Sequence, residues 1–128
     1  MTNRYKVLVD SSVWIEFFRN GHQPILEELI KEDLICTNEI ILSELLPALK
    51  HQNNTDAAEA LESIECIALN IDWAIIRQYQ QLNLQNGINK VGIPDLIILQ
   101  QVIQEKISLM SLDKHFVLVQ KHFTFEIL

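Results

Sequence analysis

Residues 5–18 read YKVLVDSSVWIEFF, and this stretch decides the fold class of the chain. Its first part, 5–9, is a short β-branched run of the kind found in buried strands. After Asp10 and two serines, apolar side chains recur at helical spacing from Val13 to Phe18. A strand that passes directly into a helix is the building unit of a parallel α/β sheet.

The same alternation continues along the rest of the chain. Further strands are predicted at 34–36, 66–69 and 107–111, with an extended run at 123–127. Pro47 is expected to bend or break the third of the predicted helices. The helices after the first are predicted at 23–31, 39–51, 56–63, 71–86, 94–105 and 114–121. The pattern predicts an α/β fold of three layers, a parallel β-sheet flanked by helices on both faces.

The composition is that of a globular protein with one domain, 1–128. The chain has 128 residues, of which 48% are hydrophobic and 21% charged. It has neither an apolar run of the roughly 18 residues that cross a membrane nor the layout of a signal peptide, so we expect a cytoplasmic protein. Cys36 and Cys66 lie in short apolar segments, and both are expected to be buried, reduced thiols.

The net charge of −7, from 17 acidic and 10 basic residues, argues against a broad basic surface for nucleic acid. Acidic side chains that gather in one cleft would contribute to this total without making the whole surface acidic. A bound cation would partly neutralise them.

Two acidic residues follow predicted strands, where α/β proteins carry their sites. Asp10 ends the first strand and Asp113 follows the strand at 107–111. Because functional crevices lie beyond the carboxyl ends of the strands, both side chains are expected at one edge of the sheet. Each residue would serve equally well as a helix N-cap, so neither decides the matter alone.

Two further acids lie on predicted helices. Asp95 lies at the end of the apolar stripe of its helix. It also lies in the first turn behind Pro94, where an acidic residue stabilises a helix without any functional role. Glu44 lies at the margin of an apolar face, where a boundary glutamate is common. The hypothesis of a site therefore depends on all four acids together.

A cluster of carboxylates needs a counter-ion, because like charges within a few ångströms repel and raise each other's pKa. Mg²⁺ or Mn²⁺ answers this need, since both prefer oxygen ligands. A bound divalent ion lowers the pKa of a coordinated water and stabilises charge on a phosphodiester. The four acids thus predict hydrolysis of a phosphodiester without a nucleophilic side chain.

The sequence resembles the PIN-domain ribonucleases, and among them the VapC-type toxins of bacterial toxin–antitoxin pairs. Four segments in order carry the resemblance: VLVDSSVWIEFF at 7–18, TNEIILSEL at 37–45, GIPDLII at 92–98 and LMSLDKHF at 109–116. Each motif is weak alone, but the four at these separations are specific and span most of the chain.

The resemblance implies a PIN-like fold and a metal-dependent endoribonuclease. Members cut single-stranded RNA or exposed loops, in tRNA, rRNA or mRNA, by a metal-activated water that leaves 5′-phosphate and 3′-hydroxyl ends. A cognate antitoxin protein and a homodimer are the implied partners. The residues matched to the Mg²⁺- or Mn²⁺-binding acids are Asp10, Glu44, Asp95 and Asp113, with Ser12 beside the first and Ser111 expected to orient Asp113 or a water.

Two positions depart from the family's pattern. Leu99, Gln100 and Gln101 stand where small alanines are common, and His115 and Phe116 stand where many relatives carry another acid. The second departure leaves open whether one metal ion or two would bind.

Several basic residues are candidates for contact with RNA phosphate, although each would also be explained as a solvated surface charge. A basic rim is needed somewhere, because phosphate contacts supply most of the affinity for nucleic acid. Lys90 is the most interesting, because its loop leads to Asp95. The candidates are Lys90, Arg19 and Lys114, followed by Arg4 and Lys6.

Two other functions compete with a ribonuclease. A phosphatase with an aspartate nucleophile usually has a second acid two positions later, where this chain has Ser12. This function therefore ranks low. A non-catalytic module that binds RNA or protein on the same fold remains the alternative.

Overall fold

The structure is a computed structural model that describes residues 6–128. Its centre is a parallel sheet of three strands in the order β2-β1-β3. The strands are β1 (Val7–Val9), β2 (Ile35–Cys36) and β3 (Ser108–Met110), and every one of their residues is buried. Such continuous burial is expected of a parallel sheet that is covered on both faces, so the α/β prediction is confirmed.

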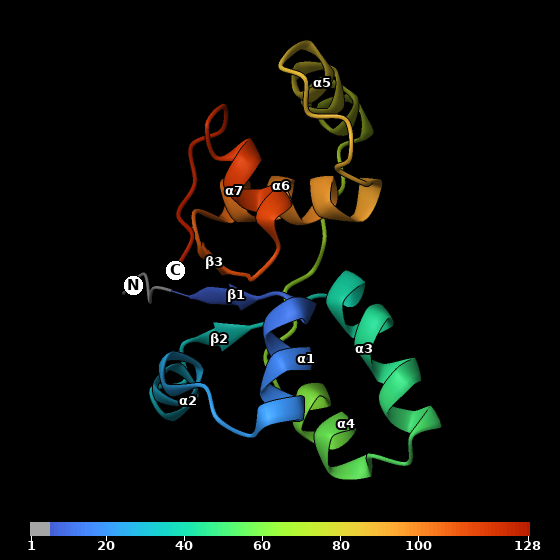
Figure 1. Cartoon of the computed structure of the whole chain (residues 1–128), viewed down its shortest axis with the longest axis vertical. Coiled ribbons are helices and arrows are strands. Elements are labelled where there is room, and N and C mark those ends of the chain that lie inside the picture. The colour runs from blue at the N-terminus through green and yellow to red at the C-terminus, as the bar shows by residue number, and fades with distance from the viewer. Residues whose placement is uncertain (1–5) are drawn as a thin grey trace.

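Seven helices surround the sheet within the described residues. In Figure 1, α1 to α4 lie on the β2 side of β1, and α5 to α7 lie on the β3 side. The helices are α1 (Ser11–Asn20), α2 (Pro24–Lys31), α3 (Glu39–His51), α4 (Thr55–Glu62), α5 (Trp73–Gln85), α6 (Ile93–Glu105) and α7 (Lys114–Val119).

Helix α6 is the central helix of the core, since all seven residues 96–102 are buried. Two of them, Gln100 and Gln101, are polar, and hydrogen bonds compensate their burial. Gln100 accepts from the backbone N–H of Asp72 and donates to the carbonyl of Asn70. Gln101 accepts from Asn38 Nδ2 at 2.8 Å. These glutamines tie α6 to segments on either side of it.

The prediction of a strand at 66–69 is wrong. Only Cys66 forms a bridge, a single parallel one with Thr37. The carbonyls of Ile67 and Ala68 instead accept hydrogen bonds from Gln101 Nε2, both at 3.3 Å. The run at 123–127 likewise forms one bridge, between Ile127 and Leu109. The buried side chain of Gln101 therefore bonds carbonyls that a strand pair would otherwise use. Local sequence patterns do not reveal such a distant partner.

Other local expectations had mixed outcomes. Helix α1 begins at Ser11, before the predicted Val13, and α3 continues through Pro47 to its end. Cys36 is buried, and this burial, more than its charged neighbours, raises the pKa of its thiol to about 12. Cys66 is exposed, contrary to the expectation of two buried thiols. Among residues 6–128, no helix has both the length and the apolar character to cross a membrane.

Candidate active site

Asp10 and Asp113 lie at the same edge of the sheet, as their places after β1 and β3 predict. The backbone N–H of Asp10 donates to the carbonyl of Met110 at 2.9 Å, which extends the β1–β3 pairing to this point. The Asp10 side chain is only 5% exposed although it stands at the N-cap of α1, and it makes no capping hydrogen bond. Helix capping therefore does not explain this buried carboxylate.

Two serine hydroxyls hold one oxygen of Asp10. Ser12 Oγ donates to Asp10 Oδ2 at 2.9 Å, and Ser111 Oγ donates to the same oxygen at 2.8 Å. The backbone N–H groups of Leu112 and Asp113 donate to Ser12 Oγ and Ser111 Oγ, both at 3.0 Å. The turn after β3 is therefore bonded to the Asp10 carboxylate. Ser111, expected to orient Asp113 or a water, accepts a hydrogen bond from the backbone N–H of Asp113.

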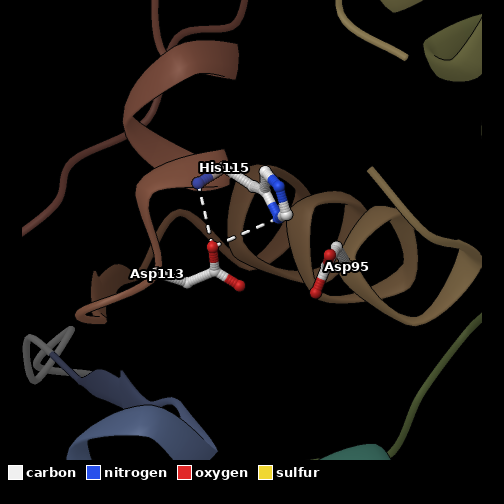
Figure 2. A group of neighbouring side chains, drawn as sticks. All are labelled: Asp95, Asp113 and His115. Carbon is white, nitrogen blue, oxygen red and sulfur yellow. Dashed lines mark hydrogen bonds and ion pairs between the residues drawn. The ribbon is translucent and has the colours of Figure 1, made fainter. Parts of the chain in front are cut away.

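Asp95, Asp113 and His115 form a compact group of possible metal ligands (Figure 2). One ligand atom from each of these residues lies within 4.8 Å of the others. Asp113 Oδ1 also accepts from the backbone N–H of His115 at 2.9 Å and lies 3.2 Å from its Nδ1. Asp113 is thus the N-cap of α7, and it faces Asp95 as well. In the sequence alone, His115 stands out only as a departure from the family's pattern.

Electrostatic interactions connect these acids with Glu44 on α3. Burial raises the pKa of Glu44, and the charges of Asp10, Asp95 and, more weakly, Asp113 raise it further. The Ser11 hydroxyl donates a hydrogen bond to Glu44, which opposes this rise. The four acids matched by sequence therefore lie close enough to influence one another, although they come from distant parts of the chain.

The pKa of Asp95 is raised by the same two effects, burial and neighbouring carboxylates. Burial is the first cause of its raised pKa, and the carboxylate of Asp113 is the second. A backbone hydrogen bond at Gly92 and the nearby His115 lower its pKa in part. The protein thus brings carboxylates together at a cost, because the neighbouring carboxylates disfavour the ionisation of Glu44 and Asp95.

The donor set fits a divalent cation. Carboxylate oxygens suit Mg²⁺ and Mn²⁺, and the imidazole of His115 is an additional ligand of the kind that transition metals accept. A cation would reduce the mutual repulsion of the acids and lower the raised pKa values of Glu44 and Asp95. Asp95, Asp113 and His115 are the residues placed to share one ion, whereas Asp10 and Glu44 interact with these acids electrostatically but do not belong to the group with ligand atoms within 4.8 Å.

The basic candidates are spread over separate surfaces. Lys90 lines a cavity of about 300 Å³ against the end of α7. Arg19 lines a different groove of about 290 Å³, which includes Glu44, and it lies 3.9 Å from Glu16. Lys114 is exposed at the start of α7.

The two remaining candidates are Lys6 and Arg4. Lys6 is held in an ion pair with Glu65 at 2.6 Å. Arg4 lies outside the described residues. Lys121 and His122, which share the Lys90 cavity, were missed because their proximity depends on the tertiary structure.

The comparison with solved structures shows the fold. The chain is similar to DNA-bound VapBC from Salmonella typhimurium, with 17% identity over 97% of each chain and a TM-score of 0.77. It is also similar to VapBC2 from Rickettsia felis bound to a promoter fragment, with 20% identity over 95% and 96% of the chains and a TM-score of 0.72. A toxin–antitoxin complex from Klebsiella pneumoniae matches with 17% identity over 85% and 88% and a TM-score of 0.59.

The sequence comparison identifies the family. No curated protein matches the chain significantly. The PIN domain family matches it over residues 7–121, which include all the acids described above. The match covers most of the sequence and agrees with the parallel sheet and its surrounding helices. This chain therefore belongs to the PIN domain family.

Proposed function

We propose that this PIN-domain protein is a metal-dependent endoribonuclease. The observation that supports the proposal is the group formed by Asp95 and Asp113 with His115, whose ligand atoms lie within 4.8 Å of one another, together with the charges of Asp10, Asp95 and Asp113 that act on Glu44. Membership of the PIN family supports a nuclease, and the carboxylate donors support Mg²⁺ or Mn²⁺ as its ion.

The side chains have distinct roles in this proposal. Asp95, Asp113, Asp10 and Glu44 would hold the ion, which when bound supplies a water of lowered pKa and a positive charge for the phosphate. Ser12 and Ser111 bind Asp10 Oδ2, so the other oxygen of Asp10 stays available to a ligand.

We further propose that the protein is the toxin of a toxin–antitoxin pair, with a cognate antitoxin protein as its partner. Similarity to a toxin–antitoxin complex and to two VapBC assemblies supports this partner. A groove of about 290 Å³ between α1 and α3 offers a partner apolar contacts at Ile15 and Phe18 and reaches Glu44. A protein bound there would lie against one of the proposed metal ligands.

A homodimer is the second proposed assembly. Trp73 and Leu84, at opposite ends of α5, are 52% and 56% exposed, so a second copy packed along this helix would cover apolar surface. Light scattering of the purified protein would test it. A mass of twice 14.8 kDa is expected, and a mass of 14.8 kDa at all concentrations would contradict the dimer.

The nuclease is tested by incubating the protein with single-stranded RNA in Mg²⁺, in Mn²⁺ and in EDTA. Cleavage is expected only with metal, and the products should carry 5′-phosphate and 3′-hydroxyl ends. Asp10→Asn should abolish cleavage, whereas Asp56→Asn, at an exposed position of α4, should leave it unchanged. Cleavage that survives Asp10→Asn would contradict the site. No cleavage by the unmodified protein, combined with RNA binding, would favour the non-catalytic binding module.

A further inference from the structure

The cavity beside the acidic cluster differs in charge from the rest of the molecule. Residues 86–90 form one of its walls, and α7 with the residues just after it forms the other. None of its lining residues is acidic, although the chain carries a net charge of −7. Lys90, Lys121, His115 and His122 all line it. This local excess of basic groups favours an anionic ligand.

The cavity adjoins the proposed metal ligands. His115 lines it, and Nδ1 of the same residue lies 3.2 Å from Asp113 Oδ1. His115 is therefore shared between the cavity and the acidic cluster. The loop at 86–90 also runs directly into the start of α6, where Asp95 lies. A ligand in the cavity would be next to any phosphate held at the cluster.

The lining combines charge with apolar surface, as a nucleotide requires. Lys90 and Lys121 form no ion pair with any group in residues 6–128, so both are available to phosphate. Leu118, 41% exposed, and Ile88 provide apolar contacts, and His122 provides a ring. Bases stack on such rings with little dependence on sequence. About 300 Å³ is at the small end of ligand pockets, which suits one nucleotide.

The walls of the cavity are held by the fold. The backbone N–H of Ile88 donates to the carbonyl of Asn83 at 2.8 Å, and Gly87 takes the left-handed conformation, φ 76°, that this turn requires. On the other side, the rings of Tyr79 and Phe123 pack edge to face with centroids 4.7 Å apart. This contact joins α5 to the segment after α7. The cavity is therefore formed before any ligand binds.

We propose that this cavity binds one nucleotide of single-stranded RNA, the one next to the phosphate that is cut. Lys90 and Lys121 contact its flanking phosphates, and its base lies against Leu118 and the His122 ring. The inference rests on the proposed nuclease function and specifies which part of the substrate this face of the protein holds.

The test measures RNA binding separately from cleavage. A fluorescent single-stranded RNA of random sequence is titrated with protein in EDTA at several salt concentrations. The variant Lys90→Ala/Lys121→Ala should weaken binding roughly tenfold, and the slope of log Kd against log salt should fall by about 0.7 for each lost phosphate contact. The matched control Lys31→Ala/Lys50→Ala removes the same charge from α2 and α3, on the other side of β1 (Figure 1), and should change neither quantity.

Two further measurements locate the base and separate the two proposals. His122→Ala should weaken binding about fivefold or more while the salt dependence is retained. RNA that contains 4-thiouridine, irradiated in the complex, should crosslink to 86–90 or 115–122. Unchanged affinity of the cavity variant, or crosslinks elsewhere, would overturn the cavity even if RNA is cut. Binding that depends on the cavity without any cleavage would overturn the nuclease and retain the RNA site.

Discussion

Ser111 Oγ lies 2.8 Å from Asp10 Oδ2, a contact between residues separated by 101 positions. It exists because β1 and β3 are adjacent and parallel, so the chain leaves both strands at the same edge. Through the Asp113 N–H, which donates to Ser111 Oγ, the contact also joins Asp10 to the turn that carries a second acid. The Ser111 hydroxyl is therefore one of two serine links between the Asp10 carboxylate and this turn, the other running through Ser12 and the Leu112 N–H.

Removal of that hydroxyl should reduce activity without unfolding the protein. In Ser111→Ala, Asp10 Oδ2 keeps only the Ser12 hydrogen bond, so its orientation is less defined. A loss of about 10- to 100-fold in kcat/KM or in metal affinity is expected, as for other groups that orient metal ligands. Ser111→Thr keeps the hydroxyl and should restore activity. Ser63→Ala, which removes an exposed serine hydroxyl far along the chain, is the control.

Divalent metal should raise thermal stability, because it binds the folded cluster and not the unfolded chain. A concentration of 100 times Kd stabilises by about 2.7 kcal/mol, which a melting curve resolves easily. The measurement compares Tm in EDTA with Tm in Mg²⁺ or Mn²⁺. The variant Asp95→Asn should lose most of this increase. An equal increase for Asp95→Asn and the unmodified protein would indicate that the ion binds elsewhere.

The stability of the metal-free protein should depend on pH through Glu44 and Asp95. Folding raises the pKa of both, mainly by burial and then by the other carboxylates. The folded state therefore binds more protons than the unfolded state at pH values just above the ordinary pKa of a carboxyl group. Linkage then requires the free energy of unfolding to fall as pH rises through that range.

Unfolding in urea at several pH values, in EDTA, measures whether the free energy of unfolding falls as pH rises. Glu44→Gln should reduce the dependence on pH, and saturating metal should reverse it, because the ion binds the ionised acids. Glu62→Gln, on α4, is the control. A metal-free protein whose stability rises steadily across the same range would contradict the electrostatic description of the cluster.

Gln101 should be important for stability rather than for chemistry. Its side chain accepts from Asn38 Nδ2 and donates to the carbonyls of Ile67 and Ala68. Gln101→Ala leaves these groups without a partner and opens a small void, at an expected cost of about 2–4 kcal/mol. Gln104→Ala, at an exposed position of the same helix, should cost less than about 0.5 kcal/mol. Urea unfolding of the two variants compares them directly.

The sequence by itself determined the fold class and indicated the acids that are candidates for the site. The β-branched run before Asp10 and the apolar stripe behind Asp95 are local patterns, and periodicity predicts a strand and a helix from them. The rule that sites lie beyond the carboxyl ends of parallel strands then placed Asp10 and Asp113 together. The periodicity of apolar residues also predicted helices α2 to α7 close to their observed bounds.

Only the tertiary structure decided which side chains meet. Gln101 takes up the carbonyls that a strand at 66–69 would have used, through contacts more than thirty positions apart. His115 lies beside Asp95 and Asp113. Lys90 and Lys121 line the same cavity because α7 packs beside the loop that follows α5. Periodicity reports the face that a residue turns to the core. It carries no information about which residue that side chain will contact, because this depends on how distant elements pack.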